Sequence, residues 1–189
     1  MIGACAGDII GSIYEGRPFK SREFPLFGKG VRYTDDSVLT VATAAVMLGD
    51  YDTTGESADA HTDGRSRAHY ARAYKEYGRY YRGRGYGGSF AGWLRSETLE
   101  AYGSFGNGSA MRVSPVGFAF EAFETSRTDE EVLAEAEASA AATHDHPEGI
   151  KGAQAVALAV FLARYGKADI GAIKYSGKGA PAGAAGTAD

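Results

Sequence analysis

Residues 35–49 form a segment that is apolar on nearly every face when it is drawn as a helix. After Asp35 and Asp36 its sequence, SVLTVATAAVMLG, contains no charged side chain, and Gly49 with Asp50 marks its end. A helix of this kind must be covered by other elements on most sides. The chain has 189 residues, enough for one domain with a core of its own. The sequence therefore predicts a buried central helix.

Helical patterns account for most of the remaining chain. We expect helices over residues 1–14, 68–83, 89–97, 116–124, 128–142 and 147–166, and a short helical turn within 168–177. Polar or glycine-punctuated loops are expected at 51–67 and 101–115. No stretch alternates as a strand would, so the predicted fold class is all-α. Residues 1–175 are expected to form a single helical domain, and the Gly/Ala/Pro-rich residues 176–189 a disordered tail.

Composition excludes several classes of protein. A net charge of -4 gives no basic footprint for nucleic acid, and no apolar run reaches the ~20 residues of a membrane span. The tyrosine- and arginine-rich segment 68–87 is interpreted as a half-exposed helix that packs its tyrosines. A single cysteine, Cys5, argues for a reducing compartment. We therefore expect a cytoplasmic protein with neither a nucleic-acid partner nor a membrane partner.

The triplet Thr34-Asp35-Asp36 stands at the start of the apolar helix. Threonine is a good N-cap, and acidic residues in the first turn interact favourably with the helix dipole. The same triplet is also an all-oxygen ligand set of the kind that Mg²⁺ or Mn²⁺ prefers. Helix capping and a metal site both remain open at this point.

Three further motifs carry polar groups. In GDIIGSIYEG, Asp8 and Glu15 lie about two helical turns apart, and the spacing of Gly3, Gly7 and Gly11 suggests close approach of another backbone. GSFGNGSAMR is a glycine-rich loop that could turn N–H groups toward an anion. ATHDHPEG places His144 between two helices, where it either lines a polar cleft or belongs to a structural loop. Zinc is improbable there because no third ligand is near.

The order of these four motifs along the chain resembles the ADP-ribosylglycohydrolase family, whose members remove ADP-ribose from modified proteins. The resemblance runs from about residue 3 to about residue 166, and GNGSAMRVSP is its most specific part. It implies a compact orthogonal helical bundle and a substrate that is an ADP-ribosylated protein or another ADP-ribose conjugate. It also implies Mg²⁺ or Mn²⁺ as cofactor, usually two ions that orient the ribose hydroxyls and a water.

The resemblance assigns roles to individual positions. It implies metal ligands at Thr34, Asp35 and Asp36, and catalytic carboxylates at Glu15, Asp35 and Asp36 that assist cleavage of the glycosidic bond. The implied substrate-binding positions line the phosphates and ribose of ADP-ribose: Ser104, Gly106, Asn107, Gly108, Ser109, Met111 and His144.

The sequence departs from the family pattern after Gly166, where nothing matches the family's further metal motif, D-x-D-[ST]. We therefore expect a bundle that lacks the C-terminal helices, and one metal ion in place of two becomes an alternative. A catalytically impaired relative that binds ADP-ribose, or has only a structural role, is the alternative function. A core that is short of helices also favours a homo-oligomer.

Overall fold

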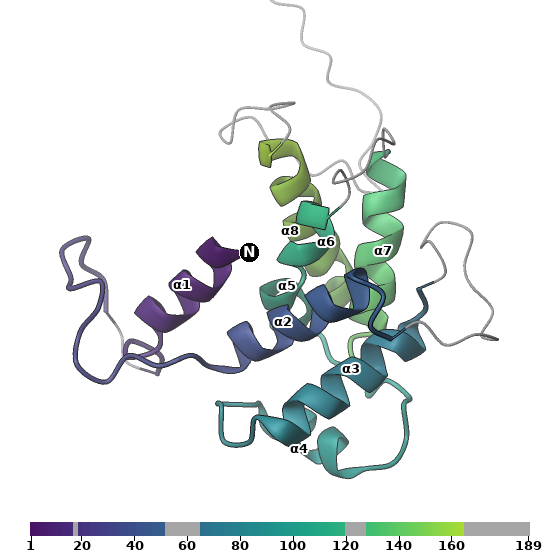
Figure 1. Ribbon diagram of the computed structural model, residues 1–189, viewed down its shortest axis with the longest axis horizontal. Coiled ribbons are helices and arrows are strands. Elements are labelled where there is room, and N and C mark those ends of the chain that lie inside the picture. The colour runs from purple at the N-terminus through teal and green to yellow at the C-terminus, as the bar shows by residue number, and fades with distance from the viewer. Residues whose placement is uncertain (17–18, 52–64, 120–127, 165–189) are drawn as a thin grey trace, which may run out of the picture.

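The computed structural model describes residues 1–16, 19–51, 65–119 and 128–164, and these contain helices and no strand (Figure 1). The all-α prediction is confirmed. In chain order the helices are α1 (Ile2–Gly11), α2 (Asp35–Met47), α3 (Arg67–Tyr80), α4 (Gly88–Arg95), α5 (Gly108–Arg112), α6 (Ser114–Ala119), α7 (Asp129–Ala141) and α8 (Pro147–Arg164).

Helix α2 lies at the centre of the described bundle and packs against α1, α3, α5 and α6 (Figure 1). Nearly all of its side chains from Ser37 to Val46 are buried, so the prediction of a buried central helix is confirmed. Val41 is the exception, at 42% exposed. Helix α3 runs back along α2, and the Tyr81 ring after α3 lies 6.3 Å from the Tyr33 ring before α2.

Two apolar clusters make up the core. One joins α2, α3 and α4 around Leu39, Tyr70 and Trp93, and the other joins α6, α7 and α8 around Val116, Val132 and Phe161. Met47, at the end of α2, packs against both clusters and so connects them.

Buried hydrogen bonds cross between these two clusters. The Tyr74 hydroxyl on α3 lies 3.0 Å from Thr43 Oγ1 on α2 and 2.8 Å from Ser139 Oγ on α7. The guanidinium of Arg112 on α5 stacks over the Tyr74 ring at 3.9 Å. A single tyrosine therefore contacts three other helices, and its polar atom is satisfied although the residue is fully buried.

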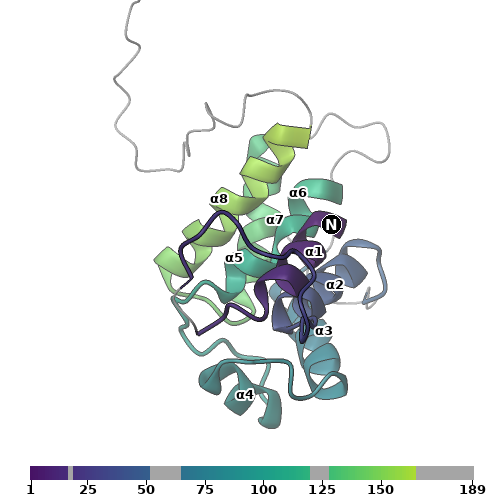
Figure 2. The same ribbon diagram turned by 90° about the vertical axis from the view of Figure 1, so that its left-hand side faces the viewer.

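Helix α1 is placed differently. It lies in front of α2 in the view of Figure 2 and packs against it, yet none of its residues is buried. Apart from the neighbouring residues and backbone of α1 itself, a Cβ added at Gly3, Gly7 or Gly11 would meet no atom within 4 Å. The expected close approach of another backbone to this glycine face is therefore not found among the described residues.

The helix boundaries differ from the predictions in several places: α3 ends at Tyr80, before the expected residue 83, and α4 ends at Arg95, before the expected residue 97. Helix α1 ends at Gly11, before the expected residue 14, and is followed by turns. Helix α5 forms inside the expected loop 101–115, because Ala110, Met111 and Arg112 are good helix formers directly after the glycines. The expected helix 116–124 is described only as α6, and the turn within 168–177 and the tail 176–189 lie outside the described residues.

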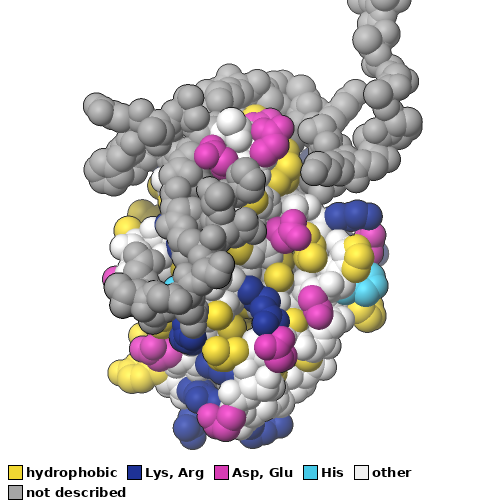
Figure 3. All heavy atoms as spheres, turned by 90° about the vertical axis from the view of Figure 1, so that its right-hand side faces the viewer, with side chains coloured by type: hydrophobic (Ala, Val, Ile, Leu, Met, Phe, Trp, Pro, Cys, Tyr) yellow, Lys and Arg dark blue, Asp and Glu magenta, His cyan; other side chains and the backbone are white. Residues whose placement is uncertain are grey.

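The described helices include none with the length and apolar character needed to cross a bilayer. On the face shown in Figure 3, acidic and basic side chains are interspersed over the described part of the surface. No single sign of charge dominates that part of the face.

Two glycine-to-alanine substitutions should have opposite effects on stability, because Gly7 lies on the open face of α1 and Gly117 lies in the packed contact of α6 with α8. Gly7→Ala should raise the free energy of unfolding by about 0.5–1 kcal/mol, because the space is open and alanine has less freedom to lose. Gly117→Ala should lower it by about 2 kcal/mol, because the new Cβ would lie 2.2 Å from the Ala157 carbonyl oxygen. Urea denaturation measures both, and equal destabilisation by the two variants would contradict the open face.

Candidate functional site

Three carboxylates gather where α1 and α2 meet. Asp8 on α1, Glu15 after α1 and Asp36 in the first turn of α2 each present an oxygen, and these oxygens lie within 4.8 Å of one another. We call this set the carboxylate cluster. Of its three members, Glu15 is exposed, while Asp8 and Asp36 are half-buried.

Asp8 holds the start of α2. One of its carboxylate oxygens accepts a hydrogen bond from Thr34 N at 2.8 Å and another from Ser37 N at 3.1 Å, as well as one from the Ser37 hydroxyl. The other oxygen accepts from the Thr34 hydroxyl at 2.6 Å. Asp8 thus satisfies N–H groups that have no partner within the first turn of the helix. Thr34 is itself the N-cap, accepting from Asp36 N at 3.4 Å.

Asp35 and Asp36 face different surroundings although they are neighbours in sequence. Asp36 belongs to the carboxylate cluster, whereas Asp35 lines a separate pocket. The Asp35 carboxylate lies against Gly85, where an added Cβ would be 3.2 Å from its Oδ1. Gly85 has φ +99°, a conformation that favours glycine. The Asp35 N–H donates to the Arg84 carbonyl oxygen at 2.8 Å.

The close carboxylates change one another's protonation. Burial first, and then the charges of Asp36, Glu15 and Asp8, together raise the pKa of Asp35 to about 6. Burial and the Asp8 charge raise the pKa of Asp36, and burial, Asp36 and Asp8 raise that of Glu15. Repulsion between the negatively charged carboxylates, which a bound cation would reduce, is the electrostatic cause of these raised pKa values.

The second half of the site is a pocket of about 260 Å³. We call it the glycine-loop pocket, since the loop before α5 forms one wall, and the start of α4 forms another. Its lining residues are Asp35, Leu39, Gly87, Gly88, Ser89, Phe90, Tyr102, Ser104, Gly106, Asn107, Gly108, Met111, Arg112 and His144.

This arrangement brings most predicted substrate-binding residues together, but not Ser109. That residue is buried and its hydroxyl donates to the Gly149 carbonyl oxygen at 2.7 Å, which ties α5 to α8. Ser104, by contrast, lines the pocket, and its hydroxyl accepts from Gly106 N at 3.4 Å. The loop therefore divides its hydroxyls between the pocket and the scaffold.

His144 forms the back of the pocket and is only 2% exposed. Burial, and then the charge of Arg112, lowers its pKa to about 4, although Asp145 opposes this shift. The imidazole is therefore neutral at pH 7. Its Nδ1 lies 2.7 Å from Thr143 Oγ1, which accepts a hydrogen bond from Arg112 Nη2 at 2.7 Å. The ring edge with Cε1 and Nε2 lies against Gly108, where a Cβ would have little room.

The sequence did not predict the roles of several residues of the site. Asp8 was noticed in the sequence, but its role in capping α2 depends on a contact between residues 26 apart. The glycine pair Gly87-Gly88 was the only available signal for the wall formed by α4. Arg112 ends the glycine motif, and its Nε is buried without a hydrogen-bond partner among the described residues.

The carboxylate cluster fits a divalent cation of the Mg²⁺ or Mn²⁺ type. It offers only oxygen atoms, the ligands that these hard cations prefer. Burial, followed by the charge of neighbouring carboxylates, raises the pKa of Asp36 and of Glu15, and a cation would offset that charge. Asp8 already uses both oxygens as hydrogen-bond acceptors. Asp36 and Glu15 therefore have the freer oxygens for a metal ion.

Two variants should separate the capping role of Asp8 from its charge. Asp8→Asn should lower the free energy of unfolding by about 1–2 kcal/mol, because one of its acceptor oxygens becomes a donor. Glu15→Gln removes the same charge from the cluster but loses no hydrogen bond that the structure describes, so stability should be unchanged or slightly higher. Urea denaturation with a chelator present gives the comparison. Equal losses in both variants would contradict the assigned role of Asp8.

Asp35 should make stability depend on pH. Folding raises the pKa of Asp35 from 3.8 to about 6, so between these two pH values the folded chain binds more protons than the unfolded chain. Above about pH 6 the Asp35 carboxylate is ionised in both states, and its charge destabilises the folded state. Asp35→Asn should therefore be more stable than the natural chain by about 1 kcal/mol at pH 7, and this difference should shrink toward pH 4. Protonation of His144 opposes folding in acid, but it is common to both proteins. A difference that does not change with pH would contradict the assignment.

Comparison with known proteins adds a family. No curated protein matches the sequence at a significant level. A model of the family described as ADP-ribosylglycohydrolase matches residues 1–180, which include the carboxylate cluster and the glycine-loop pocket. This match confirms the resemblance carried by the four motifs. The chain therefore belongs to the ADP-ribosylglycohydrolase family.

Proposed function

We propose that this protein hydrolyses the glycosidic bond between ADP-ribose and a modified protein side chain, or a related ADP-ribose conjugate. One observation carries the proposal. The first turn of α2 places Asp36 in a cluster suited to a divalent cation and Asp35 in the adjoining glycine-loop pocket. Asp35, a carboxylate that can transfer a proton, is then the neighbour in sequence of Asp36, which belongs to the cluster that can hold a metal ion.

The glycine-loop pocket supplies groups for a ribose and a phosphate. Its volume of about 260 Å³ is at the small end for small-molecule sites, so we propose that it receives the distal ribose with the adjoining phosphate. Small residues at Gly106 and Gly108 let a ligand approach the backbone. Buried Arg112 adds positive charge behind the loop, which favours an anionic ligand.

Asp35 is the proposed proton carrier. With a pKa of about 6 it can both hold and release a proton near neutral pH, as a general acid or base requires. Burial is the largest cause of that pKa, and a cation at the neighbouring cluster would leave this cause in place. A divalent cation held by Asp36, Glu15 and Asp8 would supply Lewis-acid polarisation of substrate oxygens or of a water.

His144 is proposed to position the ligand rather than to exchange protons. Its pKa of about 4 keeps the imidazole neutral over the physiological range. If Thr143 donates to Nδ1, the proton lies on Nε2, at the edge beside Gly108. A neutral donor there can bind a phosphate or ribose oxygen without changing charge during the reaction.

Binding of ADP-ribose without hydrolysis is the second candidate function. It is favoured by the hydrogen bonds that already occupy both Asp8 oxygens and leave this carboxylate less free to bind a metal ion. Such a relative would keep the glycine-loop pocket but hold a metal ion weakly or not at all.

Release of ADP-ribose from a mono-ADP-ribosylated protein distinguishes the two functions. We expect release with Mg²⁺ or Mn²⁺, loss with a chelator, and a decrease of about 100-fold or more in Asp36→Asn. Glu130→Gln, on the exposed start of α7, serves as the matched control and should keep full activity. Calorimetry with ADP-ribose accompanies the assay. If ADP-ribose binds equally with and without the metal ion and none is released from the protein substrate, the second function is favoured. If ADP-ribose is neither bound nor released, both functions are rejected.

A further inference from the structure

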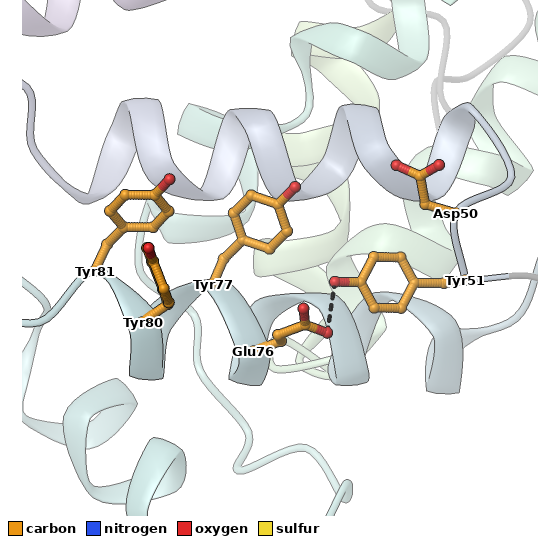
Figure 4. Close-up of a pocket in the computed structure, with 6 residues that line it drawn as sticks. All are labelled: Asp50, Tyr51, Glu76, Tyr77, Tyr80 and Tyr81. Atoms are coloured by element: carbon orange, nitrogen blue, oxygen red, sulfur yellow. Dashed lines mark hydrogen bonds between the residues drawn. The ribbon is translucent and has the colours of Figure 1, made fainter.

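A second pocket lies between α2 and α3 and shares no lining residue with the glycine-loop pocket. Its volume is about 420 Å³. Six residues line it: Asp50, Tyr51, Glu76, Tyr77, Tyr80 and Tyr81 (Figure 4). We call it the tyrosine pocket, because four of these six residues are tyrosines. Neither the proposed hydrolysis nor the carboxylate cluster uses any of these side chains.

The tyrosine rings are arranged in a row. Tyr81, Tyr77 and Tyr51 follow one another along α2, and Asp50 stands at the far end of that helix (Figure 4). The Tyr77 and Tyr81 ring centroids are 6.2 Å apart, and Tyr80 meets Tyr81 edge to face at 4.8 Å. The Tyr80 side chain is 79% exposed, so most of its ring is not covered by other residues. Ring faces and edges thus remain available at the mouth of the pocket.

The charged groups that line the tyrosine pocket are acidic, whereas the cationic Arg72, Lys75 and Arg79 line a neighbouring pocket that shares Glu76 and Tyr80 with it. Both charged side chains among the residues that line the tyrosine pocket are carboxylates, and no lysine or arginine lines it. The last turn of α2, whose carbonyl end carries partial negative charge, has no basic residue. Burial and the Glu76 carboxylate raise the pKa of Tyr51, and burial followed by Asp50 and Glu76 raises that of Tyr77. These phenols therefore stay protonated and present neutral π faces.

Glu76 is only partly engaged. Its Oε2 accepts a hydrogen bond from the Tyr51 hydroxyl at 2.9 Å, which fixes the carboxylate, and Oε1 has no hydrogen-bond partner among the described residues. The nearby Arg79 is directed elsewhere, donating to the Leu94 and Ser96 carbonyl oxygens. A fixed carboxylate beside tyrosine rings is the combination that binds an organic cation.

The protein itself stacks guanidinium groups on tyrosine in two other places. Arg84 lies over the Tyr33 ring at 3.8 Å, and Arg112 over the Tyr74 ring at 3.9 Å. In the tyrosine pocket the rings are present and the cation is not supplied by a lining residue. A planar, weakly hydrated guanidinium matches ring faces and a carboxylate better than a compact, strongly hydrated ammonium does.

We propose that the tyrosine pocket binds a guanidinium cation, with Glu76 accepting its N–H groups and the faces of Tyr77 and Tyr80 stacking against it. The cation could belong to an arginine side chain of a protein or to a small guanidinium compound. Both sources share the chemistry that the pocket recognises, and neither depends on whether the protein hydrolyses ADP-ribose.

Binding of defined probes to the full chain tests the proposal. The probes are ethylguanidinium, the peptide acetyl-Gly-Arg-Gly-amide, and the same peptide with neutral citrulline in place of arginine. In NMR titrations, the citrulline peptide should bind at least tenfold more weakly than the arginine peptide. Glu76→Gln should weaken binding of the guanidinium probes about tenfold, and Tyr80→Ala severalfold. Glu130→Gln removes an exposed carboxylate from α7 and should leave binding unchanged.

The two guanidinium probes identify the source of the cation. Equal affinity for ethylguanidinium and the arginine peptide would support a small-molecule ligand, and affinity at least tenfold higher for the peptide would support an arginine of a protein. Equal binding of the arginine and citrulline peptides would overturn the proposal. Unchanged binding in Glu76→Gln, or no binding of either guanidinium probe, would overturn it as well. Tyr80 and Glu76 are both at the surface of α3, so circular dichroism should show folded variants.

Discussion

The site depends on the hydrogen bonds that the Asp8 carboxylate accepts at the start of α2. This carboxylate accepts hydrogen bonds from Thr34 and Ser37 and so completes the N-terminus of the central helix from a different helix. Without this acceptor, the N–H groups of the buried residues Thr34 and Ser37 would lack a partner, which costs free energy comparable to a lost hydrogen bond. The same contact joins α1, which has no buried residue of its own, to the bundle. The contact that caps α2 therefore also brings the carboxylates of the cluster together. The Thr34-Asp35-Asp36 segment can serve as a helix cap and contribute to a metal site at the same time.

The scaffold beneath the site depends on Tyr74. Its hydroxyl joins α2 to α7, and its ring supports the guanidinium of Arg112, which in turn donates to Thr143 beside His144. This series of contacts runs from the centre of the core to the back of the glycine-loop pocket. A fully buried arginine is expensive unless other groups compensate its charge, and Arg112 donates hydrogen bonds to the Ser139 carbonyl oxygen and to Thr143 besides stacking on Tyr74. Its charge also lowers the pKa of His144.

Local patterns in the sequence were sufficient for the helices and for the family. The apolar run of α2, the capping box of Thr128 with Glu131 and the proline that opens α8 each act over a few residues, and the structure contains all three elements. The glycines of α1 were misleading, because spacing shows that a face is smooth but not that something packs on it.

What the sequence could not predict was the direction in which side chains of the site point. Asp35 and Asp36 are adjacent, yet a helix turns about 100° per residue, so they face different surroundings. Ser109 carries the same hydroxyl as Ser104 but points into the scaffold. Such outcomes are set by the packing of α5 on α8 and of α4 near α2, which depends on contacts distant in sequence.

The first turn of α2 also makes the two halves of the site thermodynamically dependent on each other. Asp35 already senses the charges of Asp36, Glu15 and Asp8 across that turn. Any ligand that changes charge in the glycine-loop pocket must therefore alter cation affinity at the cluster, and the cation must alter ligand affinity by the same factor. This reciprocity needs no moving part, because it acts through the electric field of two neighbouring residues on one rigid helix.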